Sequence, residues 1–327
     1  MKDRPINRPS LDELVHGIDQ SNRVMLSRAI TIIESKLASD QAQGAELLDQ
    51  IIPKSGNSVR IGITGVPGVG KSTFIEAFGT YLTSVGKKLA VLTIDPSSSV
   101  TKGSILGDKT RMNELSKNPN AFIRPSPSGS SLGGVAQKTR ETIILCEAAG
   151  YDVIIVETVG VGQSETAVND MVDFFLLLML AGGGDELQGI KRGIMEMADA
   201  LVINKAEADN MKAAKNAQKA YQNALHLLPA HEGGWTVPVS LCSALEKTGI
   251  EGIWEIVTEY KALTQQNDYF NKQRREQNLK WMHEVIKLRL ESEFFNDPAK
   301  KTLLQQLGAK VTAGELSVRH AVAQLFN

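Results

Sequence analysis

A glycine-rich run at residues 65–72 constrains the fold of this 327-residue chain more than any other feature. Its sequence, GVPGVGKS, matches the pattern G-x-x-x-x-G-K-S/T at every fixed position. A β-branched run, Val59–Thr64, precedes it, and a segment with helical spacing, Thr73–Ser84, follows it. Glycines let backbone N–H groups curl around phosphate oxygens, and the next helix directs its positive end at the anion. The order strand, loop, helix therefore predicts a P-loop.

The P-loop predicts which residues hold a nucleoside triphosphate. Lys71 is expected to bridge the outer phosphates and act in catalysis, and the Ser72 hydroxyl is expected to bind Mg²⁺. The predicted phosphate-binding residues are Gly65, Val66, Pro67, Gly68, Val69, Gly70, Lys71, Ser72 and Thr73. A chance glycine-rich turn is the alternative interpretation, and the flanking strand and helix argue against it.

A buried run that ends in an acid, residues 152–160, predicts the group that orients the metal ion. P-loop sites need a carboxylate at the end of a neighbouring strand, and Glu157 stands there where Asp is usual. Its longer side chain is expected to reach the metal through water. Gly160 is placed so that its N–H contacts the γ-phosphate. Asp95 and Asp108 fit either a metal ligand or a turn or helix cap.

A second polar segment predicts how the base is recognised. A carboxylate in the pattern N-K-x-D after a strand accepts the ring N–H and the exocyclic amine of guanine. Asn204 and Lys205 fit this pattern, and Glu207 stands where Asp is expected. A polar turn is the alternative reading. Three residues after the next predicted strand are expected to close the pocket with backbone N–H groups: Ser243, Ala244 and Leu245.

The pattern of the whole chain predicts an α/β fold with N- and C-terminal helical extensions. We expect helices in 1–57, a P-loop domain over 58–265 and a helical arm over 266–327. In the central region, short apolar runs alternate with helical segments, which indicates a mostly parallel sheet flanked by helices. The predicted strands are Val59–Thr64, Leu89–Ile94, Ala121–Arg124, Val153–Glu157, Phe174–Leu180, Ala200–Asn204 and Val237–Cys242.

Composition narrows the expected partners and compartment. The formal net charge is −1, so nucleic acid is not an expected partner. The longest apolar run, Phe174–Ala181, is far shorter than the roughly 20 residues of a membrane helix. The N-terminus lacks the apolar core of a signal peptide. Cys146 and Cys242 lie in apolar stretches, and we expect buried, reduced thiols and a cytoplasmic location.

Four stretches of the chain together resemble a known family. They are residues 65–72; residues 95–98 with 103–112; residues 157–165; and residues 182–193, which read GGGDELQGIKRG. They are similar to the MeaB/MMAA-type GTPases, also called ArgK-like or LAO/AO transport-system kinases, which chaperone adenosylcobalamin-dependent methylmalonyl-CoA mutase. The similarity covers nearly the whole chain.

The resemblance implies a homodimeric GTPase that gates loading of the cobalamin cofactor and protects the mutase. It implies that the C-terminal helices form the dimerisation arm. It also makes Ser72, Asp95, Asp108 and Glu157 the candidate Mg²⁺ ligands, and it makes Lys191 a catalytic residue that approaches the nucleotide during activation. Glu207 departs from the family's usual Asp and bears on guanine selection.

Three other functions are compatible with a P-loop. The first is a nucleotide-dependent kinase or ATPase of lysine, arginine and ornithine transport, which the family's older name suggests. The second is a metal-insertion GTPase, although the five histidines are scattered and no C-x-x-C run exists. The third is a scaffold with a relic P-loop, which the complete motif and nearby acids argue against.

Overall fold

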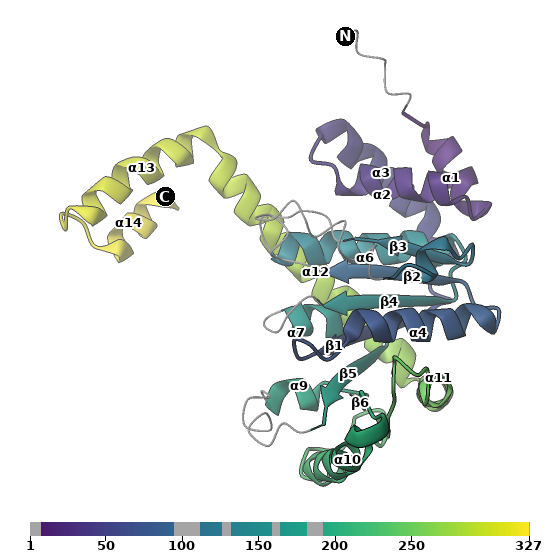
Figure 1. The fold of residues 1–327 in the computed structure, drawn as a ribbon. Coiled ribbons are helices and arrows are strands. Elements are labelled where there is room, and N and C mark those ends of the chain that lie inside the picture. Colours follow the sequence, from purple (N-terminus) through teal and green to yellow (C-terminus); the bar gives the residue numbers. More distant parts are fainter. Residues whose placement is uncertain (1–7, 95–111, 126–131, 159–163, 182–191, 327) are drawn as a thin grey trace. The chain divides into compact units, whose positions relative to one another are not determined.

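The computed structural model describes residues 8–94, 112–125, 132–158, 164–181 and 192–326. Within these ranges seven strands form one sheet in the order β3-β2-β4-β1-β5-β6-β7, and all neighbouring strands are parallel (Figure 1). The strands are β1 Val59–Gly65, β2 Leu89–Ile94, β3 Ala121–Arg124, β4 Val153–Thr158, β5 Phe174–Leu180, β6 Ala200–Asn204 and β7 Val239–Leu241. The predicted α/β class and all seven predicted strands are confirmed.

The one notable difference lies in the last strand. The apolar run predicts Val237–Cys242, but β7 covers only Val239–Leu241. It begins after Pro238, whose nitrogen has no hydrogen to donate to a ladder. The Pro238 carbonyl still accepts from Leu201 N at 3.0 Å, so the run remains aligned with β6 before the strand begins.

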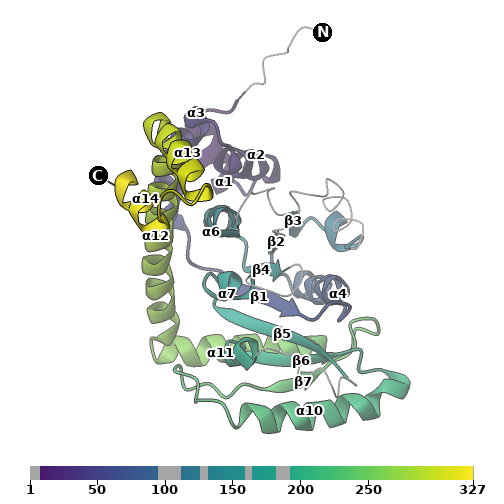
Figure 2. The same ribbon diagram turned by 90° about the vertical axis from the view of Figure 1, so that its left-hand side faces the viewer.

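Helices cover both faces of the sheet, which is why the strands are apolar at nearly every position. Every residue of β2 and of β4 is buried. α4 (Lys71–Ser84) and α11 (Ile250–Gln266) pack in one hydrophobic cluster on one face. α6, α7 and α10 pack on the other, and Figure 2 shows α4 and α6 on opposite sides of the sheet. These helices span Leu132–Ala148, Ser164–Asn169 and Met211–Leu225, and α9 spans Arg192–Glu196.

Three N-terminal helices form an outer layer on α6, as the helical spacing of residues 8–53 predicts. They are α1 (Leu11–Asp19), α2 (Arg23–Glu34) and α3 (Ala38–Ile51). Their buried aliphatic side chains join the cluster that contains α6 and β4. Ser10 and Glu13 form a capping box at the start of α1. Short 3₁₀ helices cover Ile52–Lys54, Leu115–Lys117 and Ala208–Asn210.

The chain divides into two compact units, residues 1–277 and 278–327. α12 (Tyr269–Asn296) contributes to both. Its first turns belong to the first unit because Arg274 pairs with Asp173 at 2.6 Å and also donates to Gly56 O and Ser58 O. The domain boundaries predicted at 57/58 and 265/266 stay predictions.

The second unit has a small core of its own. It consists of the end of α12 with α13 (Pro298–Thr312) and α14 (Val318–Leu325). Leu307, Ala321 and Leu325 are buried there, and the Phe294 ring packs against them. Asp297 caps α13 with its side chain, and Pro298 occupies the first turn, where its missing N–H costs nothing.

Two further sequence-based expectations bear on the described chain. Cys146 and Cys242 are both buried and not joined to each other or to another cysteine, as predicted. No helix among the described residues has the length and apolar character to cross a membrane.

Candidate functional site

The P-loop connects the carboxyl end of β1 to α4. Gly68 and Gly70 have φ values of 78° and 90°, which side-chain-bearing residues rarely adopt. A Cβ on Gly65 would lie 2.5 Å from the Leu178 carbonyl oxygen on β5. Gly70 occupies the N-cap position of the 14-residue helix α4, and no side chain accepts a hydrogen bond from the first N–H groups of that helix. These N–H groups can therefore bind an anion.

Lys71 places a cation inside this loop. Its Nζ donates to the Gly65 carbonyl at 2.8 Å. Burial lowers the pKa of Lys71, and the negative charges of Glu157 and Glu165 oppose this effect. An anion arriving at the loop would favour the charged ammonium, so phosphate binding and the protonation of Lys71 support each other.

Two buried carboxylates lie near Lys71. Glu157 is the fifth residue of β4 and pairs in register with Ile63 on β1, and its side chain is 4% exposed. Glu165, in the first turn of α7, is 1% exposed. The Thr158 hydroxyl donates to the Thr64 hydroxyl at 2.9 Å, and this hydrogen bond ties the ends of β4 and β1 together. Carboxylate and hydroxyl oxygens are the ligands of a hard divalent cation, so Glu157 and the half-buried Ser72 fit Mg²⁺.

Glu165 was not among the residues that the sequence predicted for the site. Nothing in its spacing marks it as buried beside Lys71. Only a weak signal exists, namely an acid in the first turn of a helix that directly follows the acid-ended strand.

The predicted base-reading segment lies beside the P-loop. Asn204 ends β6, and its Nδ2 donates to the Val69 carbonyl at 2.8 Å, while its Oδ1 accepts from Ala244 N at 3.1 Å. Lys205 Nζ donates to the Gly68 carbonyl at 2.9 Å. Parallel strands end at the same edge of the sheet, and these bonds therefore join the phosphate loop to the two loops that the sequence predicts to read the base.

Glu207 is held at the edge of this site by Ser243. The Ser243 hydroxyl donates to Glu207 Oε2 at 2.5 Å and accepts from Glu246 N at 3.0 Å. Ser243 has a single hydroxyl proton and donates it to Oε2 of Glu207. The other carboxylate oxygen, Oε1, can therefore turn to a ligand. The N–H groups of Ser243 and Ala244 are both bonded within the protein, and the Leu245 side chain is 75% exposed.

The structure thus brings most of the predicted site residues to one edge of the sheet. These are residues 65–73, Glu157, Asn204, Lys205, Glu207 and residues 243–245. Four predicted residues lie outside the described ranges: Asp95, Asp108, Gly160 and Lys191.

Comparison with known proteins identifies the family. Residues 26–299 match the family described as methylmalonyl Co-A mutase-associated GTPase MeaB. GTPase ArgK of Escherichia coli (strain K12) is 47% identical over 98% of this chain and 97% of its own length. The Mus musculus protein named methylmalonic aciduria type A homolog, mitochondrial, is 42% identical over 97% of this chain and 79% of its own length.

A solved structure agrees with both. The crystal structure described as that of an LAO/AO transport system kinase covers 98% of both chains at 40% identity, with a TM-score of 0.77. The family match covers far more than half of the residues, and the Escherichia coli relative aligns over 97% of its own length. The chain therefore belongs to the family of methylmalonyl-CoA mutase-associated P-loop GTPases, the MeaB family.

Proposed function

We propose that this P-loop GTPase binds GTP with Mg²⁺ and serves as a chaperone of an adenosylcobalamin-dependent methylmalonyl-CoA mutase. It would gate the loading of the cofactor and protect the enzyme. One observation carries the nucleotide part of this proposal, namely the Asn204 side chain that bonds both the P-loop and the Ala244 loop. The family's description supports the partner, as does the name of the mouse relative.

The phosphate site supports hydrolysis by in-line attack of water on the γ-phosphate. Lys71 and the uncapped N–H groups at the start of α4 would stabilise the charge that develops on the phosphate oxygens. Ser72 and Glu157 would hold Mg²⁺, with Asp95 and Asp108 as further proposed ligands. The metal would supply additional neutralisation of the phosphate charge.

Two residues outside the described ranges complete the proposed cycle. Gly160 would sense the γ-phosphate through its N–H, and Lys191 would approach the nucleotide when the partner binds. The family resemblance supports both roles. A lysine that arrives only in the complex would make hydrolysis slow in the free protein and faster with the mutase.

The second unit supports a homodimer. Leu279, Met282, Ile286 and Leu290 recur at helical spacing along α12, and each is at least 45% exposed. A stripe of apolar side chains at this spacing is typical of a helix that packs against another. We propose that a second copy of the chain covers it.

The buried, reduced thiols support a cytoplasmic location. The net charge of −1 supports proteins and nucleotides as partners rather than nucleic acid or membrane.

Lys71→Ala is expected to lower GTP hydrolysis by about 10²-fold or more, because it removes the cation inside the P-loop. The affinity for GTP should fall as well. Phosphate release and titration calorimetry measure the two effects. Lys36→Ala, at an exposed position between α2 and α3, is the control and should behave as the unaltered protein. Unchanged turnover in Lys71→Ala would overturn the assignment of the site.

Glu207→Ala is expected to abolish the preference for GTP over ITP, which lacks the exocyclic amine of guanine. The loss of one charged hydrogen bond corresponds to about 10- to 100-fold in relative affinity. Ser243→Ala, which frees the carboxylate to rotate, should give a smaller loss in the same direction. Asp209→Ala, two residues along the chain and exposed, is the matched control. A retained preference in Glu207→Ala would remove this residue from base recognition.

Adding the mutase is expected to raise the rate of GTP hydrolysis, with inorganic phosphate as the product. Lys191→Ala should lose most of this stimulation. The rate is followed during a titration with the mutase, and the complex by gel filtration. Absence of both a rate change and a complex would contradict the chaperone role. Labelled phosphate on a protein acceptor would instead favour the transport kinase that the LAO/AO relative's name describes.

Ile286→Glu is expected to convert the dimer into a monomer, because a buried unpaired charge is costly in an apolar interface. Sedimentation velocity should show a species of one 35.5 kDa chain in the variant and of two chains in the unaltered protein. Lys287→Glu introduces the same acid at an exposed neighbouring position and should leave the dimer intact. A monomeric unaltered protein would rule the dimer out.

A further inference from the structure

The backbone pairing of β1 with β4 ends at the nucleotide site. β1 leads into the P-loop, and β4 carries Glu157 near its carboxyl end. The two strands are paired from Val59 with Val153 to Ile63 with Glu157, which is the last pair in register. Beyond this pair β1 enters the phosphate loop. The ladder therefore stops where the P-loop and the proposed metal ligand on β4 have to be held relative to each other.

One residue further along, two side chains connect the strands. The Thr158 hydroxyl donates to Thr64 Oγ1 at 2.9 Å. Thr158 is 0% exposed and Thr64 is 1% exposed, so water cannot replace either partner of this hydrogen bond. Thr64 directly precedes Gly65 of the P-loop, and Thr158 directly follows Glu157. The hydrogen bond thus joins the residues that flank the two parts of the site.

The two hydroxyls lie on the other face of the sheet from the Glu157 side chain. Side chains alternate between the faces of a strand. The odd-numbered residues at the start of β4 pack in the cluster that contains α4, and the even-numbered ones pack in the cluster that contains α6. Glu157 therefore points to the α4 face and Thr158 to the α6 face. The threonines can hold Glu157 in place without contacting the ion that it serves.

A bound Mg²⁺ ion is sensitive to where its ligands are held. It requires a nearly ideal octahedron with oxygen atoms at about 2.0–2.1 Å. A small displacement of Glu157 relative to Ser72 would therefore weaken metal binding. The N–H groups at the start of α4 follow β1 directly and do not depend on β4. Loss of the hydroxyl bond should thus act on the metal ion and spare the binding of phosphate.

From this geometry we propose that Thr158 and Thr64 are positioning residues for the Mg²⁺ site, and that their hydrogen bond holds Glu157 in place relative to Ser72. This inference rests on the proposed function, in which Ser72 and Glu157 hold Mg²⁺. It adds to that function the pair of side chains that fixes the arrangement of the metal ligands.

The test measures how much Mg²⁺ strengthens the binding of guanylyl imidodiphosphate, a GTP analogue that is not hydrolysed. Titration calorimetry on the full chain gives the affinity with Mg²⁺ and with EDTA. Thr158→Val removes the hydroxyl and keeps the size, and it should reduce the gain in affinity from Mg²⁺ by about tenfold. The affinity in EDTA should not change. Thr158→Ser keeps the hydroxyl and should keep the gain, and an unchanged gain in Thr158→Val would overturn the proposal.

A double-variant cycle tests the pair itself. Thr64→Val removes the other partner of the hydrogen bond and should show the same loss as Thr158→Val. The two changes together should add little to either one, because each alone already abolishes the same bond. Losses that add up would show that the two hydroxyls act independently and would contradict a positioning pair.

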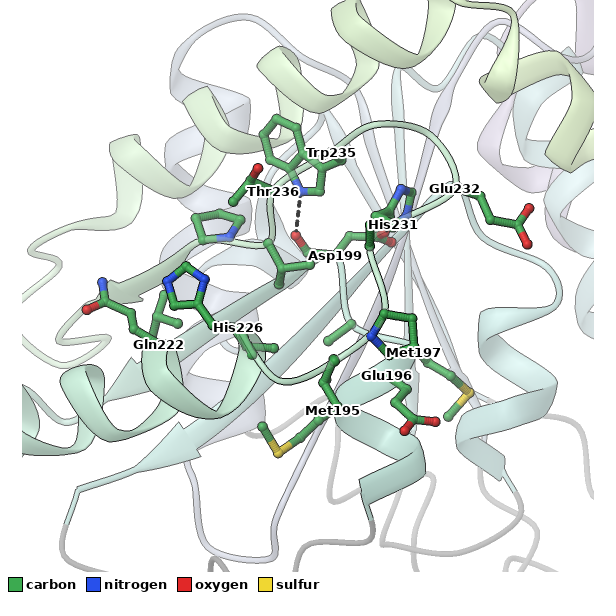
Figure 3. Close-up of a pocket in the computed structure, with 18 of the residues that line it drawn as sticks. Met195, Glu196, Met197, Asp199, Gln222, His226, His231, Glu232, Trp235 and Thr236 are labelled. Carbon is green, nitrogen blue, oxygen red and sulfur yellow. Dashed lines mark hydrogen bonds and ion pairs between the residues drawn. The ribbon is translucent and has the colours of Figure 1, made fainter.

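Two controls separate positioning from a general loosening of the fold. Thr264 is 0% exposed in α11 and donates to Tyr260 O of its own helix at 2.7 Å, so Thr264→Val removes the same atoms elsewhere. Trp235 Nε1–H donates to Asp199 O at 2.8 Å beside a pocket at the amino ends of β6 and β7, and Figure 3 marks this bond with a dashed line. Trp235→Phe removes it at the opposite edge of the sheet from the P-loop. Thermal unfolding reports the stability lost in each variant, and both should keep the full Mg²⁺ gain. An equal fall in either would contradict the proposal.

Glu157→Gln distinguishes this inference from the metal site on which it rests. The neutral amide is a poor Mg²⁺ ligand, so this variant should lose most of the gain in affinity from Mg²⁺. A full gain in Glu157→Gln would overturn the assignment of the metal ligand and the role of the threonines with it. Loss in Glu157→Gln together with a full gain in Thr158→Val would overturn the role of the threonines alone.

Discussion

The site depends on one side-chain amide, that of Asn204 at the carboxyl end of β6. The amide nitrogen donates to the P-loop carbonyl of Val69, and the amide oxygen accepts from the backbone of Ala244. Asn204 is 1% exposed, so neither bond can be replaced by water. An aspartate would set a carboxylate against a carbonyl, and an aliphatic residue would leave two buried groups unsatisfied at about 1–3 kcal/mol each. The phosphate loop is therefore positioned by the segment that we propose to read the base.

Ion pairs that stabilise the fold lie at the amino ends of the strands, opposite the nucleotide site. Arg60 forms two hydrogen bonds to Glu147, both at 2.9 Å, and Arg274 forms two to Asp173. Burial alone would raise the pKa of Glu147, but the pairing with Arg60 outweighs it, and the pKa lies below its usual value. This carboxylate thus stabilises the fold above its unfolded pKa, and the contribution is lost as pH falls through the folded pKa. The Arg274–Asp173 pair anchors the start of α12, and the Arg60–Glu147 pair joins β1 to α6.

Local patterns were sufficient to predict the sheet and the P-loop. The strands are continuous apolar runs because both faces are covered, and the phosphate loop has fixed spacing, so each is visible within a short window of sequence. Contacts between distant residues were not visible in this way. Ser243 and Glu207 are 36 residues apart, and Arg274 and Asp173 are 101 apart. Glu165 likewise becomes a neighbour of Lys71 only when α7 folds against β4 and β1.

Gly70 illustrates how closely the parts of the site are fitted. A Cβ at this position would approach Asn204 Nδ2 to 3.0 Å, a distance tighter than nearly all contacts of real side chains. Even a methyl group would therefore push the amide away from Val69 and, with it, the loop that ends β6. The bare backbone of this glycine acts as a spacer between two recognition elements. A side chain at this position would therefore disturb the segment that we propose to read the base as well as the phosphate loop.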